Sequence, residues 1–149
     1  MASHTPPHQA LETLLVEHRQ LKGLLEKIDR ALEQRRDTID QVGDLLGQLG
    51  DRLIKHFALE EEGGYFADAL LHAPQLVSKA NALLAQHPRI CTQAVTMARE
   101  IRCQQAADED WWQQTAIRFR AFREELLRHE RHENGLLQEA YTQDLGAHD

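Results

Sequence analysis

Hydrophobic residues recur every three or four positions along most of the chain, which is the spacing of helices that bury one face. The first such segment follows a short tail and ends near residue 34. Period-two alternation is absent, β-branched residues are sparse, and the chain has only four prolines. These features predict an all-α fold. The stripe of the first segment comprises Leu11, Leu14, Leu15, Leu21, Leu25, Ile28 and Leu32.

The second segment begins with Thr38-Ile39-Asp40-Gln41, a capping-box sequence. Its apolar stripe continues to Glu60, and Gly63-Gly64 predicts a break or kink soon afterwards, because glycine weakens a helix interior. Tyr65 lies just beyond this break, where its hydroxyl could reach a site between the helices. The second helix is therefore expected to break or kink at this pair, and Tyr65 to Leu71 could continue it for two turns.

The third segment is predicted to run from about residue 75 to about residue 104, with Val95 among its inward residues. Pro88 lies in its middle and predicts a kink, because proline cannot donate a backbone hydrogen bond. The fourth segment begins at Asp108, which can cap a helix, and runs to about residue 143. Its predicted stripe includes Ile117 and Phe119.

Four long helices with short connections predict an up-down-up-down antiparallel four-helix bundle. The bundle is expected to occupy residues 8–145, between tails at residues 1–7 and 146–149. A chain of 149 residues that is 42% hydrophobic can bury a core without a metal or disulfide. Cys91 and Cys103 would lie about 18 Å apart on one helix, so both thiols are expected to be free.

The charge pattern excludes some classes of partner. The net charge is −7, and lysines and arginines are interspersed with acidic residues, so we expect no nucleic-acid partner. No apolar run approaches the roughly 20 residues of a membrane span, and the start of the chain lacks the features of a signal peptide. We therefore expect no membrane association and a cytoplasmic location.

Each predicted helix carries a histidine on its apolar stripe, near its middle: His18, His56, His87 and His129. Their heights can be counted from the predicted turns. At 1.5 Å per residue, His18 and His56 lie about 27 and 30 Å from the turn that joins their helices. Counting from the other two predicted turns gives similar heights for His56 and His87 and for His87 and His129. The four imidazoles are therefore predicted to share one layer of the bundle.

Two glutamates extend this layer. At 100° per residue, Glu60 lies about 40° from His56, on the same face of the helix. Glu61 lies about 140° away and is predicted either to be solvated or to contact a metal ligand without binding metal itself. In the fourth helix, Glu133 lies about 40° from His129.

Two other residues near His129 are less well aligned with it. Glu130 lies about 100° away and His132 about 60° away on the other side. The angles therefore favour Glu133 as the donor, with His132 as a supporting or alternative ligand.

Four imidazoles and two carboxylates in one buried layer are hard to satisfy with hydrogen bonds alone. Two divalent metal ions, each with two imidazoles and bridged by the two carboxylates, would use all six donors. This nitrogen and oxygen mixture suits iron or manganese and accommodates zinc. A ferritin-like site needs Glu-x-x-His, but Leu53 and Leu126 occupy the glutamate positions.

These residues resemble the haemerythrin-like (HHE cation-binding) domain family. The resemblance lies in His18, His56-Phe57-x-x-Glu60-Glu61, Gln86-His87 and His129-Glu130-x-x-Glu133, and it covers nearly the whole chain. It implies a four-helix bundle that holds a non-haem di-iron centre reacting with O2, NO or peroxide. The ligands it implies are the six already identified: His18, His56, Glu60, His87, His129 and Glu133.

One position departs from the oxygen-carrying members of the family. They have a second histidine four residues after the ligand of the third helix, where this chain has Cys91. A set of four histidines and two glutamates is more similar to regulatory or enzymatic members than to reversible O2 carriers. Cys91 is interpreted either as a small buried apolar residue or as a thiolate beside the metals.

The resulting hypothesis is a cytoplasmic di-iron protein that binds or senses O2 or related small ligands. Two alternatives use the same centre: a peroxide-removing, catalase- or peroxidase-like enzyme, and an iron-storage or metal-sensing module. The sequence identifies no protein partner.

Overall fold

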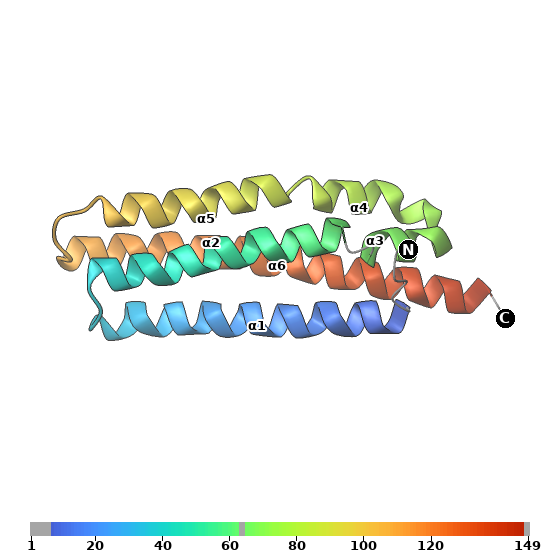
Figure 1. Cartoon of the computed structure of the whole chain (residues 1–149), viewed down its shortest axis with the longest axis horizontal. Helices are drawn as coiled ribbons and strands as arrows, with labels where there is room; N and C mark the ends of the chain where they lie inside the picture. The colour runs from blue at the N-terminus through green and yellow to red at the C-terminus, as the bar shows by residue number, and fades with distance from the viewer. Residues whose placement is uncertain (1–6, 63–64, 148–149) are drawn as a thin grey trace.

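The computed structural model describes residues 7–62 and 65–147, and every regular element within them is helical (Figure 1). The elements are α1 (Pro7–Gln34), α2 (Ile39–Glu62), α3 (Tyr65–His72), the 3-10 turn η1 (Pro74–Leu76), α4 (Val77–Leu84), α5 (His87–Arg102) and α6 (Glu109–Ala147). The break expected at Gly63-Gly64 lies outside the described residues.

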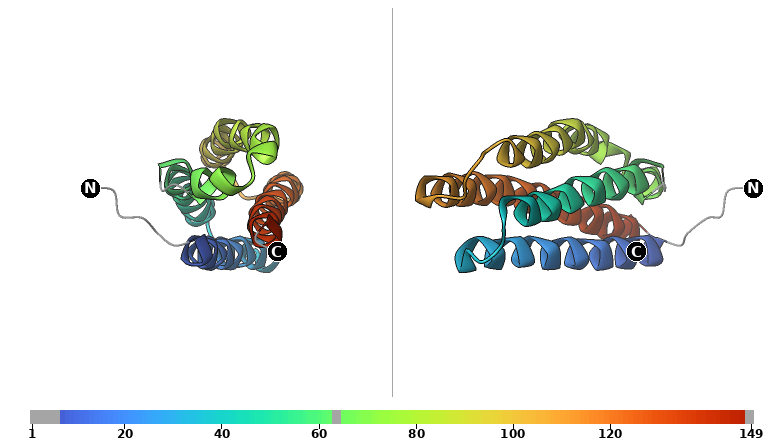
Figure 2. Two further views of the ribbon diagram at one scale, coloured as in Figure 1. Left: turned by 90° about the vertical axis from the view of Figure 1, so that its right-hand side faces the viewer. Right: turned by 60° about the vertical axis from the view of Figure 1, so that its left-hand side comes forward.

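The helices form the predicted up-down-up-down antiparallel four-helix bundle. Its four arms are α1, α2, α4 together with α5, and α6, while α3 and η1 form the corner between the second and third arms (Figure 1). The view along the bundle shows the four arms surrounding a common axis (Figure 2). The chain therefore has the all-α class and topology that its apolar pattern predicts.

Local sequence sets the helix ends. The capping box forms as expected, because Thr38 N donates to Gln41 Oε1 at 2.8 Å and Gln41 N donates to Thr38 Oγ1 at 3.1 Å. Asp108 caps α6 by accepting a hydrogen bond from Trp111 N at 2.8 Å. Arg35 ends α1 in the left-handed region, with φ of 53°.

The kink predicted at Pro88 is a complete break between α4 and α5. Ala85 and Gln86 separate the two helices, and Gln86 N donates to Leu83 O at 3.0 Å instead of continuing the helical pattern. Pro88 lies in the first turn of α5, where its missing N–H costs nothing. This break places Gln86 and His87 at the middle of the third arm.

Two apolar clusters fill the bundle, one on each side of the histidine layer. The larger cluster includes Leu53 of α2, Ile90 of α5 and Leu126 of α6. The smaller cluster includes Leu83 of α4 and Leu136 of α6. His87 lies between Leu83 and Ile90 in sequence, and the 129–133 segment lies between Leu126 and Leu136. The polar layer is therefore closed above and below by apolar packing.

Two residues predicted to face inward are exposed. Ile117 is 61% exposed and Val95 is 44% exposed. Ile117 lies about 200° round the helix from Phe119, which is fully buried, so the two cannot share one face. The predicted stripes were therefore wider than the buried faces.

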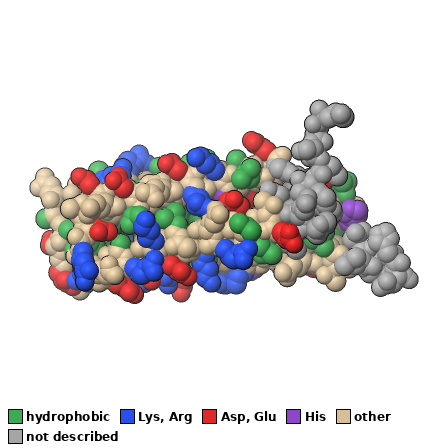
Figure 3. Space-filling view, turned by 60° about the horizontal axis from the view of Figure 1, so that its bottom comes forward, with side chains coloured by type: hydrophobic (Ala, Val, Ile, Leu, Met, Phe, Trp, Pro, Cys, Tyr) green, Lys and Arg blue, Asp and Glu red, His purple; other side chains and the backbone are tan. Residues whose placement is uncertain are grey.

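The surface carries both signs of charge. On the face shown in Figure 3, acidic and basic side chains are interspersed rather than gathered into a single basic patch. In the part of the chain that the structure describes, no helix has both the length and the apolar character that crossing a membrane requires.

Candidate metal centre

The four histidines on the apolar stripes meet in one layer of the bundle. The ring centroids of His18 and His56 are 5.0 Å apart, and those of His87 and His129 are also 5.0 Å apart. His56, His87 and His129 are at most 2% exposed. The layer thus contains two pairs of imidazoles, one from α1 and α2 and the other from α5 and α6.

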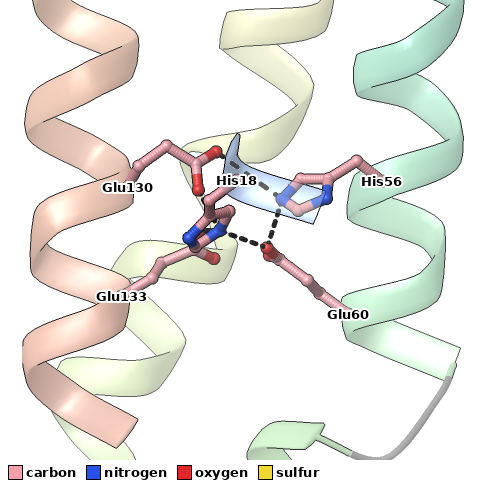
Figure 4. Close-up of side chains that lie close together, drawn as sticks. All are labelled: His18, His56, Glu60, Glu130 and Glu133. Atoms are coloured by element: carbon pink, nitrogen blue, oxygen red, sulfur yellow. Dashed lines mark ion pairs between the residues drawn. The ribbon is translucent and has the colours of Figure 1, made fainter. Parts of the chain in front are cut away.

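The first pair belongs to a group of five donors, drawn in Figure 4: His18, His56, Glu60, Glu130 and Glu133. Glu60 Oε1 lies 2.7 Å from His56 Nε2 and 3.6 Å from His18 Nε2. Glu130 forms an ion pair with His18, and its Oε1 lies 3.6 Å from His56 Nε2. All five ligand atoms lie within 4.8 Å of one another.

The second pair belongs to a group of four buried donors: His87, His129, Glu60 and Glu133. Glu60 Oε2 lies 3.2 Å from His87 Nε2, and Glu133 Oε2 lies 3.1 Å from the same nitrogen. Glu133 Oε1 lies 3.2 Å from His129 Nε2. Glu60 and Glu133 therefore belong to both groups.

Most of these donor atoms are close together without forming hydrogen bonds. His56 Nε2, His129 Nε2 and both oxygens of Glu60 are buried and lack a hydrogen-bond partner, as are both oxygens of Glu130. His56 Nε2 and Glu60 Oε1 are 2.7 Å apart, so geometry rather than distance prevents the bond. Buried polar atoms left unpaired are costly, and metal ions between them would satisfy them. The donor set fits a metal site.

The carboxylates favour charge on the first histidine pair. Burial lowers the pKa of His56, but the neighbouring Glu130 and Glu60 carboxylates outweigh it and raise that pKa to about 10. Burial likewise opposes charge on His18, yet the same two carboxylates raise its pKa. In the metal-free protein, these two imidazoles therefore favour their protonated forms, and the protons take the place that metal ions would occupy.

The two carboxylates nearest to these histidines respond in the opposite direction. Burial acts to raise the pKa of Glu60 and of Glu130, but neighbouring groups outweigh it and lower both values. For Glu130 these groups are His18 and His56. Both carboxylates therefore favour the ionised form that a metal ligand needs.

Glu133 and His129 favour their neutral forms. Burial and the neighbouring carboxylate of Glu60 raise the pKa of Glu133 well above its usual value. Burial lowers the pKa of His129 to about 4, so its imidazole is neutral near pH 7. A neutral imidazole has one lone pair available for a metal.

Side chains around the second pair fix its orientation. His129 Nδ1 lies 2.8 Å from Gln86 Oε1, which can only accept, so Nδ1 carries the hydrogen and Nε2 keeps its lone pair toward the layer. Phe57 stacks on His87, with ring centroids 3.8 Å apart and planes 5° apart. Glu61 is half-exposed and places Oε1 3.8 Å from His87 Nδ1.

Glu130 is 5% exposed and belongs to the five-donor group, although helical angles in the sequence did not predict it as a donor. Angles counted from His129 are misleading here, because His129 lies at one edge of the buried face of α6. The buried residues Phe119, Phe122, Leu126 and Leu137 centre about 60° round the helix from His129. Glu130 lies about 40° from this centre, whereas His132 lies about 120° from it.

The supporting residues proposed from sequence have different positions. His132 is exposed, and Cys91 is partly buried and packs against the larger apolar cluster; neither belongs to the donor groups found among the described residues. Burial and the nearby Glu61 carboxylate raise the pKa of the Cys91 thiol, which disfavours a thiolate. Cys91 and Cys103 are both free. The side chain of Tyr65 lies outside the described residues.

Comparison with known proteins gives one family. A family model described as the hemerythrin HHE cation binding domain matches residues 9–141. No curated protein and no solved structure gives a significant match. The matched segment contains the four histidines and three glutamates of the layer. Because it also spans most of the 149 residues, the chain belongs to the hemerythrin HHE cation-binding domain family.

Proposed function

We propose that the chain is a non-haem di-iron protein that binds or senses O2 or a related small ligand such as NO or peroxide. The observation that carries the proposal is the position of Glu60 between the two groups. Its Oε1 lies 2.7 Å from His56 Nε2, and its Oε2 lies 3.2 Å from His87 Nε2. A carboxylate that turns one oxygen to each histidine pair is suited to bridge two ions.

The number and type of donors favour iron or manganese over zinc. One group offers two imidazoles and three carboxylates, which exceeds the four ligands of a tetrahedral zinc site. Imidazole and carboxylate together suit iron or manganese. Cys91 belongs to neither donor group, and its raised pKa disfavours the thiolate that would have favoured zinc.

The two groups differ in a way that suggests where a small ligand binds. The group with His18 and His56 has five donors, whereas the group with His87 and His129 has four. Glu130 supplies the extra donor of the first group. The ion held by His87 and His129 would therefore have the more open coordination, and iron there would supply a site for O2, NO or peroxide and one-electron chemistry.

The chain's own residues control the surroundings of this group. Phe57 covers one face of the His87 ring, while Leu53 and Leu126, both fully buried, belong to the apolar cluster on one side of the layer. These apolar side chains exclude bulk water and strengthen electrostatic interactions within the layer. Glu133 favours its protonated form in the absence of metal, so it would release a proton on becoming a ligand of the ions.

The proposal is tested by loading metal-free protein anaerobically with Fe(II) and then admitting air. We expect near-ultraviolet charge-transfer bands of oxidised di-iron to appear, and NO to give a distinct spectrum with the reduced protein. His56→Ala and Glu133→Ala should lose both signals, while His132→Ala should keep them. Unchanged spectra on exposure to air and NO would contradict ligand binding. Steady O2 evolution from hydrogen peroxide would instead favour an enzyme.

A further inference from the structure

A groove of about 520 Å³ runs between α4 and α6, next to the histidine layer but outside it. The two helices are antiparallel, so its lining residues face one another in three levels along the groove. Gln86 lies opposite Arg131 and His132, Leu83 lies opposite Leu136, and Lys79 lies opposite Glu139, with which it pairs at 3.8 Å. This volume is within the range of small-molecule sites.

The middle level is apolar and is kept open by a glycine. Leu83 and Leu136 are buried and form the floor. Gly135 lines the same level, and a Cβ built there would meet no atom within 4 Å. Glycine inside a helix costs about 1 kcal/mol relative to alanine, and no close packing requires it here. The absence of a side chain at Gly135 therefore leaves space in the groove.

The level nearest the histidine layer offers hydrogen-bond donors. Gln86 Oε1 is occupied by His129 Nδ1, so the two N–H groups of Gln86 Nε2 remain available, and no described residue accepts from them. Arg131 is exposed and forms no ion pair with any residue that the structure describes. His132 lines the same level. Such donors match a carboxylate.

We propose that this groove binds a small aliphatic carboxylate. Its carboxylate accepts hydrogen bonds from Arg131 and Gln86, and its apolar chain lies on Leu83 and Leu136 beside Gly135. Residues 131 and 139 are separated by about 12 Å along α6, which sets the length of the ligand at about six to eight carbons. The Lys79–Glu139 pair closes the far end. A cationic ligand is disfavoured because Arg131, at the end of the groove nearest the histidine layer, carries a positive charge that no ion pair with a described residue neutralises.

Binding in the groove would act on the histidine layer through one side chain. A carboxylate held by Gln86 Nε2 polarises the amide whose Oε1 accepts from His129 Nδ1 at 2.8 Å. This link makes the groove a regulatory site for the proposed metal centre. The link rests on the proposed function, whereas binding in the groove does not.

The test uses the full-length metal-free protein and hexanoate as the probe, with affinity measured by calorimetry. We expect saturable binding with one site per chain, weaker binding of acetate, and no binding of hexylamine. Arg131→Gln and Gly135→Leu should each weaken hexanoate roughly tenfold or more, since one removes a charge-assisted hydrogen bond and the other fills the groove.

Two matched controls separate loss of the site from general damage. Arg128→Gln removes an exposed arginine that does not line the groove, and Gly23→Leu adds a side chain to another helix where a Cβ also meets nothing within 4 Å. Both should bind hexanoate as the wild type does. The proposal would be overturned if Arg131→Gln and Gly135→Leu bound hexanoate as tightly as the wild type does. It would also be overturned if the wild type bound hexylamine as tightly as hexanoate.

The link to His129 has its own readout in the metal-free protein. Hexanoate should shift the ring nitrogen resonances of His129, and Gln86→Leu should abolish that shift. Binding without any shift at His129 would reject the regulatory link and retain the groove as a binding site. Because no metal is present in either measurement, failure of the di-iron proposal would not change these results.

Discussion

Glu130 of α6 forms an ion pair with His18 of α1, and the two residues join the first and last arms of the bundle across the donor layer. Glu130 also distinguishes the two donor groups, because it belongs to the one that contains His18 and His56. Its contribution to metal binding can be separated from that of the two carboxylates that both groups share.

Glu130→Gln keeps the size of the side chain and removes its charge. We expect the affinity for the metal ion at His18 and His56 to fall roughly 10- to 100-fold, since one charged donor is lost. The ion at His87 and His129 should bind almost as before. Competition with a chelator during metal titration would resolve the two affinities.

The control for Glu130→Gln is Glu124→Gln, which neutralises an exposed glutamate on the same helix outside both donor groups. It should bind both ions as the wild type does. Glu130 would not be a ligand if its variant and this control gave the same two affinities.

Gln86→Leu tests the hydrogen bond that orients His129. Without an acceptor for Nδ1, the ring no longer has a fixed tautomer with Nε2 toward the layer, and metal affinity should fall roughly 10- to 100-fold. Gln93→Leu changes an exposed glutamine on α5 and should leave metal affinity unchanged. Isothermal titration with Fe(II) under anaerobic conditions measures both. Equal affinities in the two variants would exclude the orienting role.

Glu60 and Glu133 should differ in their effect on the metal-free fold. The pKa of Glu60 is lowered, so its charged form stabilises the folded protein above the ordinary glutamate pKa, and this stabilisation is lost as pH falls. Glu60→Gln should therefore lower the free energy of unfolding by about 3 kcal/mol at pH 7. The pKa of Glu133 is raised, and its neutral form resembles glutamine. Glu133→Gln should cost less than about 1 kcal/mol.

Urea denaturation of the two metal-free variants makes this comparison. Equal losses of stability, or a larger loss in Glu133→Gln, would contradict a charged Glu60 beside a neutral Glu133 in the metal-free protein.

Metal binding should release protons. His56 has a pKa of about 10 in the folded metal-free protein against an ordinary 6.5, so between these values the folded protein holds a proton that the unfolded chain has lost. That proton stabilises the metal-free fold below pH 6.5, and the stabilisation disappears as pH rises toward 10. A metal ion must displace it, so affinity should rise with pH over the same range.

Calorimetry in two buffers of different ionisation enthalpy counts the released protons at pH 7.5. His132→Gln, outside both groups, should release the same number as the wild type. Metal binding with no proton release would contradict the described state of His56.

The sequence predicts the fold and most of the layer because both depend on helical periodicity and on helix length. The heights of His18, His56, His87 and His129 follow from counting residues, and Thr38, Asp108 and Pro88 mark helix boundaries by chemistry that acts locally. Glu130 was missed because the direction of the bundle axis depends on the neighbouring helices. The groove beside Gly135 and the contact from Gln86 to His129 depend on the direction that the chain takes between α4 and α5 at Ala85. Pro88 predicts a kink there, but no local pattern specifies that direction.

The bridging position of Glu60 is tested most directly by counting iron. Protein purified without an affinity histidine tag is loaded anaerobically with Fe(II), freed of loose metal, and measured by elemental analysis. The wild type should hold about two iron ions per chain, and Glu60→Ala should hold about one or fewer, because both groups lose a shared ligand. No more than one iron per chain in the wild type, or two retained in Glu60→Ala, would contradict the bridged di-iron centre.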